Sequence, residues 1–263
     1  MDLDIEVCKT IAIRHGLPLQ FVIKEFHLMH ILGQIAAFIA SRPNALVFKG
    51  GTALSKVYLK KVQRFSEDLD FDLVVRGAEG ELVRFSKELA EKLTEYKIME
   101  FRRVRSTIQF YCIYETPLGG KDHVRIDIAP KKLLTVKPPE NMQIESEFTH
   151  ASVIGLKVYS IEDLTARKMN ALAGRNEGKD VYDAHAALQL CSKKVLKSAI
   201  GLMLKSEGAD DTVEVFMQKA IKRLEKSDPQ KLRNLTNPFI PYANRPKNWE
   251  ELKNDLLIKL AEL

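Results

Sequence analysis

Residues 47–54, Val-Phe-Lys-Gly-Gly-Thr-Ala-Leu, and residues 64–72, Arg-Phe-Ser-Glu-Asp-Leu-Asp-Phe-Asp, decide how the rest of the sequence is interpreted. The first stretch begins within the apolar run 45–48 and continues through two glycines into residues 52–59, whose apolar positions have helical spacing. This pattern predicts a strand, a tight turn and a helix. The second begins an alternation of polar and apolar residues over 68–75, which predicts a strand with carboxylates on one face.

The aspartates of this second stretch point to a metal. Asp68, Asp70 and Asp72 would lie on the same strand face, and like charges this close are unfavourable without a cation. Mg²⁺ prefers such oxygen ligands and is often held by one or two carboxylates plus substrate phosphates. Asp127, in the alternating segment 122–128, could supply a third carboxylate if the two strands are neighbours. Taken alone, the aspartates are equally typical of a solvated sheet face, and Asp70 with Asp72 is an alternative ligand pair.

The glycine turn offers a place for phosphate. Gly50 and Gly51 allow close approach to the backbone, the following helix start presents free N–H groups, and Thr52 adds a hydroxyl. The spacing of a Walker loop is absent. A plain tight connection is the alternative, and Lys49 and Lys56 could contact phosphate or simply be solvated.

The remaining pattern predicts an α+β protein with a helical C-terminal half. A largely helical segment over 4–42 is closed by Pro43-Asn44, and residues 131–150 look irregular or strand-containing. We expect helices over 81–96, from 160 to an interruption at Gly174, and over 179–190, 193–206, 210–226 and 247–262, and strands over 97–114 and 122–128. These elements divide the chain into an α/β core with N-terminal helices (1–158) and a helical domain (159–263).

The composition is that of a soluble globular protein. The 263 residues are 45% hydrophobic and 29% charged, with no apolar run of the roughly 18 residues that a membrane span needs. The acidic N-terminus does not resemble a signal peptide, so we expect a cytoplasmic protein without a membrane partner. Three scattered cysteines have no zinc-binding spacing. A net charge of +6 suits phosphate-rich partners such as nucleotides or RNA.

Together the motifs resemble a known family. A strand, Gly-Gly-Thr, a helix and an Asp-x-Asp strand resemble the signature of the polymerase-beta-like nucleotidyltransferase fold. The wording of residues 48–56 and 64–70 resembles the AbiEii/AbiGii family, the MenT-like nucleotidyltransferase toxins of type IV toxin–antitoxin and abortive-infection systems. A third block, residues 160–172 and 175–183, resembles the C-terminal motif of that family. The resemblance covers roughly residues 40–190.

The resemblance implies a set of site residues. Asp68 and Asp70 correspond to metal ligands for Mg²⁺ or Mn²⁺, and Lys168 to a catalytic or triphosphate-binding cation. Asp183 corresponds to a catalytic polar group near the nucleotide or the acceptor. The implied nucleotide and phosphate contacts are Gly50, Gly51, Thr52, Ser66, Lys179 and Asp180. Without the motif, Lys168 would be interpreted as a solvated helix lysine and Asp180 as a helix cap or a member of an ion pair. Arg175 could bind phosphate or pair with Glu162 or Glu177.

The implied activity is transfer of a nucleoside monophosphate from an NTP to an acceptor hydroxyl, with release of pyrophosphate. The resemblance suggests RNA, and first the 3′ end of tRNA, as acceptor, and a cognate antitoxin as partner. A protein-modifying nucleotidyltransferase or phosphotransferase, and a non-catalytic nucleotide-binding module, are the alternatives. Base preference and oligomeric state are left open.

Overall fold

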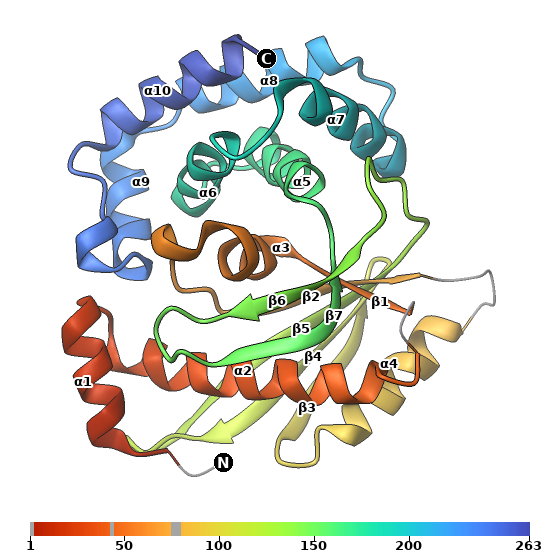
Figure 1. Ribbon diagram of the computed structural model, residues 1–263, viewed down its shortest axis with the longest axis vertical. Coiled ribbons are helices and arrows are strands. Elements are labelled where there is room, and N and C mark those ends of the chain that lie inside the picture. The colour runs from red at the N-terminus through yellow and green to blue at the C-terminus, as the bar shows by residue number, and fades with distance from the viewer. Residues whose placement is uncertain (1–2, 43–44, 75–79) are drawn as a thin grey trace.

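The computed structural model describes residues 3–42, 45–74 and 80–263, and it is built on one seven-stranded sheet. In Figure 1 the helix labelled α2 runs across the front of the lower strands, and the C-terminal helices lie above the sheet. The strands are β1 (Leu46–Lys49), β2 (Asp68–Val74), β3 (Lys97–Val104), β4 (Thr107–Glu115), β5 (Lys121–Lys131), β6 (Glu140–Glu145) and β7 (Ser152–Val158).

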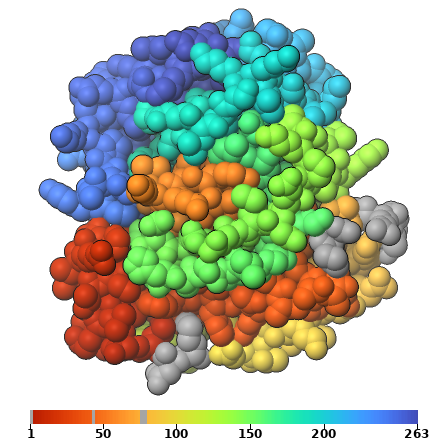
Figure 2. Space-filling model, viewed as in Figure 1, coloured from red at the N-terminus to blue at the C-terminus, as the bar shows by residue number. Residues whose placement is uncertain are grey.

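The N-terminal and central helical segments are α1 (Ile5–His15), α2 (Leu19–Ile39), α3 (Gly50–Ala53), the π-helical segment η1 (Leu54–Leu59), the short 3-10 turn η2 (Lys60–Val62) and α4 (Glu81–Lys92). The C-terminal half contains α5 (Ile161–Gly174), α6 (Gly178–Leu188), α7 (Lys193–Glu207), α8 (Val213–Glu225), α9 (Pro229–Thr236), η3 (Asn237–Phe239), η4 (Tyr242–Asn244) and α10 (Trp249–Ala261). Figure 2 shows these C-terminal elements as one blue-to-cyan mass above the red and green elements of the sheet layer.

The sheet is mixed, in the order β3-β4-β5-β2-β1-β7-β6. Strand β2 runs parallel to β5 and antiparallel to β1, while β1 runs parallel to β7. The alternation predicted for β2 and β5 is present, with apolar side chains buried toward α2 and polar ones on the other face. The predicted α+β class, with a helical C-terminal half, is therefore correct.

The predicted N-terminal helical segment is two helices. Gly16 adopts φ 62° after α1, a left-handed conformation that ends the helix at low cost. Among the described helices, α2 alone is long and apolar enough to cross a membrane, but 67% of its apolar stretch is buried inside the protein. It packs against the sheet as a core helix. The predicted stop at Pro43-Asn44 lies outside the described residues.

Several predicted bounds were wrong. The helix after β1 begins at Gly50, two residues early, and the helix from Glu81 ends at Lys92 instead of continuing to residue 96. Strand β2 ends at Val74, and residue 75 lies outside the described part. Strand β7 and the eight-residue α9 were not predicted, although Asp228 followed by Pro229 is a recognisable helix start.

Two apolar clusters organise the core. One joins the sheet to α1, α2 and α4, and the other fills the space among the C-terminal helices. Helix α5 contributes to both, with Leu164 in the first cluster and Ala166 in the second. The division at 158/159 stays a prediction, because α5 connects the two clusters without a break.

A buried ion pair fixes the helix that follows the glycine turn. The Lys56 ammonium of η1 contacts the Glu25 carboxylate of α2, and both side chains are fully buried. The interpretation of Lys56 as a solvated or phosphate-binding lysine was therefore wrong.

Replacing Lys56 alone should make the folded protein less stable. Lys56→Met leaves Glu25 charged and buried, so we expect the free energy of unfolding to fall by about 3–5 kcal/mol in denaturant titrations. The double variant Glu25→Leu/Lys56→Met should recover most of that loss and bind NTP as the wild type does. A double variant as unstable as the single one would contradict this account.

Candidate active site

The carboxylates of β2 and β5 lie next to one another on adjacent interior strands of the sheet. The parallel register places Asp70 opposite Asp127 and Asp68 opposite Arg125. The Arg125 guanidinium lies 2.6 Å from Asp68 Oδ2 and 3.4 Å from Asp127 Oδ2. Gln109 of β4 donates to Asp127 Oδ1 at 2.9 Å. The two strands are thus neighbours, as the assignment of Asp127 to the site required.

Asp72 is separated from this group by its own partners. Its buried carboxylate accepts from Lys49 Nζ at 2.5 Å and from the Tyr159 hydroxyl at 2.6 Å. Both oxygens are therefore occupied by protein donors, which argues against Asp70 and Asp72 as the ligand pair. Lys49 is likewise not the free phosphate-binding lysine that was considered.

The electrostatics of Asp70 favour a bound cation. Burial raises the pKa of Asp70 to about 6, with Lys49 opposing and the Asp127 and Asp68 carboxylates adding to the rise. Burial also raises the pKa of Asp68, against the influence of Arg125. A divalent ion would stabilise the ionised form of all three carboxylates.

The donor set fits a hard ion such as Mg²⁺, because it consists of carboxylate oxygens on adjacent strands. Within the described ranges, no three His, Cys, Asp or Glu side chains are already gathered closely enough to hold a metal by themselves. Arg125 lies among the carboxylates instead. A site of one or two carboxylates completed by substrate phosphates is compatible with this arrangement.

The two glycines are required by close contacts on opposite sides. Gly50 has φ 79°, and a Cβ there would overlap the Asp70 carboxylate. A Cβ on Gly51 would lie 2.7 Å from Arg64 Nη2 and 3.5 Å from Lys168 Nζ. The turn is therefore the boundary between the acidic group and a group of cations.

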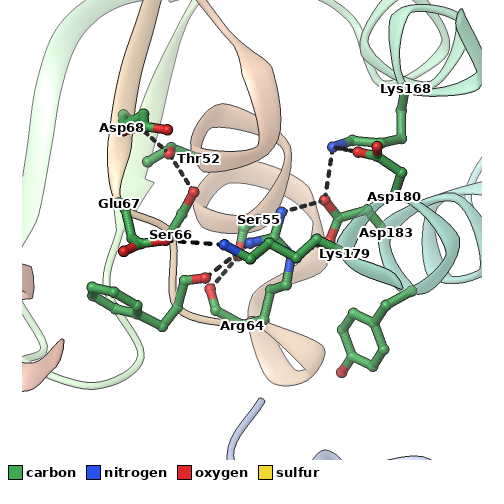
Figure 3. Close-up of polar contacts among 12 residues, drawn as sticks. Thr52, Ser55, Arg64, Ser66, Glu67, Asp68, Lys168, Lys179, Asp180 and Asp183 are labelled. Carbon is green, nitrogen blue, oxygen red and sulfur yellow. Dashed lines mark hydrogen bonds and ion pairs between the residues drawn. The ribbon is translucent and has the colours of Figure 1, made fainter. Parts of the chain in front are cut away.

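The Thr52 and Ser66 hydroxyls join the helix start to β2. Thr52 Oγ1 lies 2.5 Å from the Asp68 carbonyl oxygen and 2.7 Å from Ser66 Oγ, and both side chains are buried. Figure 3 shows this link beside Asp68. The structure thus assigns both hydroxyls a part in holding Asp68 in place.

The cations on the other side of the turn come from segments far apart in sequence, before β2 and on α5. Arg64 donates twice to Asp183 of α6, at 2.8 and 2.6 Å, and Lys168 Nζ of α5 lies 2.9 Å from Asp180 and 3.0 Å from Asp183 (Figure 3). Burial is the largest influence and opposes the charged forms of Arg64 and Lys168, but Asp183 and Asp180 together outweigh it, so the pKa of each is raised. The Lys168 side chain is 9% exposed, so it is not the solvated lysine that the helix pattern alone suggested.

Arg175 completes the group. It contacts Asp180 at 2.8 Å and Glu177 at 3.4 Å, not Glu162. Burial raises and Lys168 and Arg175 lower the pKa of Asp180, and the net shift is downward. Arg64, Lys168 and Arg175 are thus paired with the buried carboxylates of Asp180 and Asp183 and with Glu177, and of these cations Arg64 and Lys168 lie next to Gly51.

Lys179 connects the helical half to the residue before the metal-site strand. Its ammonium lies 3.0 Å from Glu67 Oε2 and 3.4 Å from the centre of the Phe239 ring. These contacts order Lys179 next to Asp68, at the edge of the site.

Three contributors were missed from the sequence. Arg64 stands in the quoted motif without a role, Arg125 was placed on the alternating strand without one, and Tyr159 was not singled out. The one available signal for Arg64 was that it is the only basic residue in the otherwise acidic and apolar motif 64–72.

Comparison with known proteins identifies the family of the chain. A family model described as the nucleotidyl transferase AbiEii toxin of type IV toxin–antitoxin systems matches residues 36–262. The chain belongs to this family. None of the curated proteins matches it in sequence.

Two solved structures are similar to the fold. The MenT4 nucleotidyltransferase toxin of Mycobacterium tuberculosis is 17% identical, with 100% of this chain and 91% of that chain covered and a TM-score of 0.70. JHP933 from Helicobacter pylori is 19% identical, with 94% and 92% covered and a TM-score of 0.54. The predicted nucleotidyltransferase family and fold are confirmed, and as an AbiEii-family member the chain is an NTP-using nucleotidyltransferase toxin.

The raised pKa of Asp70 has a measurable consequence. Between its unfolded pKa near 3.8 and its folded pKa of about 6, the folded state binds more protons, so stability falls as pH rises through that window. Asp70→Asn removes this cost, and in EDTA at pH 8 it should raise the free energy of unfolding by up to about 3 kcal/mol. The gain should shrink to about 0.5 kcal/mol at pH 4 and vanish at lower pH, below the unfolded pKa.

Adding Mg²⁺ or Mn²⁺ should raise the melting temperature of the wild type and leave that of Asp70→Asn unchanged. If Asp70→Asn is less stable than the wild type at pH 8, and metal raises its melting temperature as much as that of the wild type, then Asp70 is not a metal ligand.

Proposed function

We propose that this protein transfers a nucleoside monophosphate from an NTP to a hydroxyl of RNA, with the 3′ end of tRNA as the first candidate, in a reaction that depends on Mg²⁺ or Mn²⁺. The observation that carries the proposal is the position of the Gly50-Gly51 turn. It lies in direct contact with Asp70 on one side and with Arg64 and Lys168 on the other. A metal–triphosphate needs both kinds of surface at once.

Asp68 and Asp70 would hold the metal, with Asp127 as the third carboxylate. The bound ion would neutralise phosphate charge and orient the acceptor oxygen. Asp127 is kept in place by Gln109, and Asp68 by the Thr52–Ser66 link at its backbone. These contacts fix the carboxylates before substrate arrives.

Lys168 would stabilise the negative charge that grows on the leaving pyrophosphate. Its ammonium is held by Asp180 and Asp183 at one edge of the glycine turn, so no reorganisation is needed when that charge appears. Asp183 acts through this arrangement, because it also fixes Arg64. Asp180, Arg175 and Lys179 would complete the phosphate side.

RNA suits the charge of the chain. The net charge of +6 favours a polyanionic acceptor, since cationic side chains release counterions from nucleic acid. As the toxin of a type IV system, the protein would act on a cellular RNA and be opposed by a cognate antitoxin.

An acceptor screen tests the proposal. Purified protein, Mg²⁺ and each labelled NTP are incubated with total tRNA or with total protein, and label is followed on gels. We expect label on tRNA, and a loss of 10²–10³-fold in rate for Asp70→Asn and Lys168→Met. The matched control is Lys219→Met, which removes an exposed lysine of α8 that is paired with Asp211.

Label on protein instead of RNA would support a protein-modifying transferase. If calorimetry found neither NTP nor metal binding, the chain would be a non-catalytic module. Expression in cells with wild type and Asp70→Asn tests the toxin role by growth arrest.

A further inference from the structure

One face of β5, β4 and β3 is left open beside the carboxylates. Helices α2 and α4 pack on the other face, where Phe110, Val124 and Ile126 are buried. On the open face, alternate residues of β4 and β5 are only partly buried, among them Gln109, Tyr111 and Arg125. The sheet therefore has a polar surface that leads from the active site to its edge.

The strand register aligns this surface in two rows. Asp70, Asp127, Gln109 and Arg102 form one row across β2, β5, β4 and β3, and Asp68, Arg125, Tyr111 and Met99 form the next. Hydrogen bonds run along the first row, since Arg102 Nη2 donates to Gln109 Oε1 at 2.9 Å and Gln109 donates to Asp127. Three strand spacings give the surface a width of about 14 Å.

The chemistry of these side chains suits unpaired bases and phosphates. Tyr111 is partly exposed and meets the His123 ring edge to face at 4.9 Å, and Met99 is 45% exposed. Neither is needed for the core, which lies on the opposite face. The guanidinium groups of Arg102 on β3 and Arg125 on β5 flank the strand of Tyr111, the first paired with Glu100 and the second with Asp68 and Asp127, and both could exchange these partners for phosphate. Sheet faces with aromatic residues stack two or three bases of single-stranded RNA.

We propose that this face, here called the acceptor platform, binds the single-stranded 3′ end of the acceptor RNA, stacking the terminal bases on Tyr111 and directing the 3′ hydroxyl toward Asp70 and Asp127. The platform consists of Met99, Arg102, Gln109, Tyr111, His123 and Arg125. This inference rests on the proposed RNA acceptor and adds the path by which that acceptor reaches the site.

The test measures RNA binding and NTP binding separately. Fluorescence anisotropy follows a labelled eight-nucleotide single-stranded RNA, and calorimetry follows NTP with Mg²⁺. Tyr111→Ala should weaken RNA binding about 10-fold and leave NTP binding unchanged, and Tyr111→Phe should bind RNA as the wild type does. Arg102→Ala should reduce the slope of log affinity against log salt by about 1.

Matched controls lie elsewhere on the surface. Tyr242→Ala removes a 75% exposed tyrosine and Arg84→Ala an arginine with a 75% exposed side chain on α4, and neither should change RNA binding. If Tyr111→Ala melts early, Met99→Ala and Arg102→Ala serve in its place, because both residues are exposed.

The outcomes separate the platform from the proposed function. RNA labelling by the wild type with unchanged RNA affinity in the Tyr111 and Arg102 variants would overturn the platform alone. Labelling of protein and no RNA affinity in the wild type would overturn the RNA acceptor, and the platform with it. Equal affinity for a blunt RNA duplex would also contradict the platform, since paired bases cannot stack on Tyr111.

Discussion

The bidentate contact between Arg64 and Asp183 is the interaction on which the site depends. It joins the residue four positions before β2 to helix α6 across 119 positions of sequence, and both side chains are buried. Removing either partner would leave a charge buried without compensation, at a cost of about 3–5 kcal/mol. Lys168 shares Asp183 with Arg64, so the same contact sets the position of the lysine. The two halves of the chain therefore meet through residues of the candidate site, and motifs far apart in sequence have to occur together.

The glycine turn separates charges that would otherwise neutralise each other. Asp70 lies against Gly50, and Arg64 and Lys168 lie against Gly51. Arg64 and Lys168 are paired with Asp180 and Asp183, and Asp68 is paired with Arg125, so each side of the turn has its own partners. A ligand that combines a divalent cation with phosphates would meet the acidic group through its cation and the basic group through its phosphates.

The local sequence pattern predicted the features that depend on neighbouring residues in the chain. The period-two alternation of β2 and β5 follows from burial of Leu69 and Ile126 on one face, and it placed Asp68, Asp70 and Asp127 correctly on the other. Which strands are neighbours, and what covers each position, depends on contacts at long range. Asp72 has the same local pattern as Asp70, yet Tyr159, 87 residues away, encloses it. Lys56 looked like any helix lysine, because its partner Glu25 belongs to an earlier helix.

Arg125 connects the acidic group to the open sheet face. Its guanidinium contacts Asp68 and lies near Asp127, while its buried Nε has no hydrogen-bond partner within the described residues. Asp68 and Asp127 tie up much of its charge, although the same oxygens are those that a metal would take. A cation bound there would compete with Arg125 for these ligands and would weaken the contacts that hold the guanidinium. Tyr111 lies opposite Arg125 in the strand register, so a guanidinium released in this way would lie beside the aromatic ring. Under the proposed function, its positive charge would then be available to an acceptor phosphate.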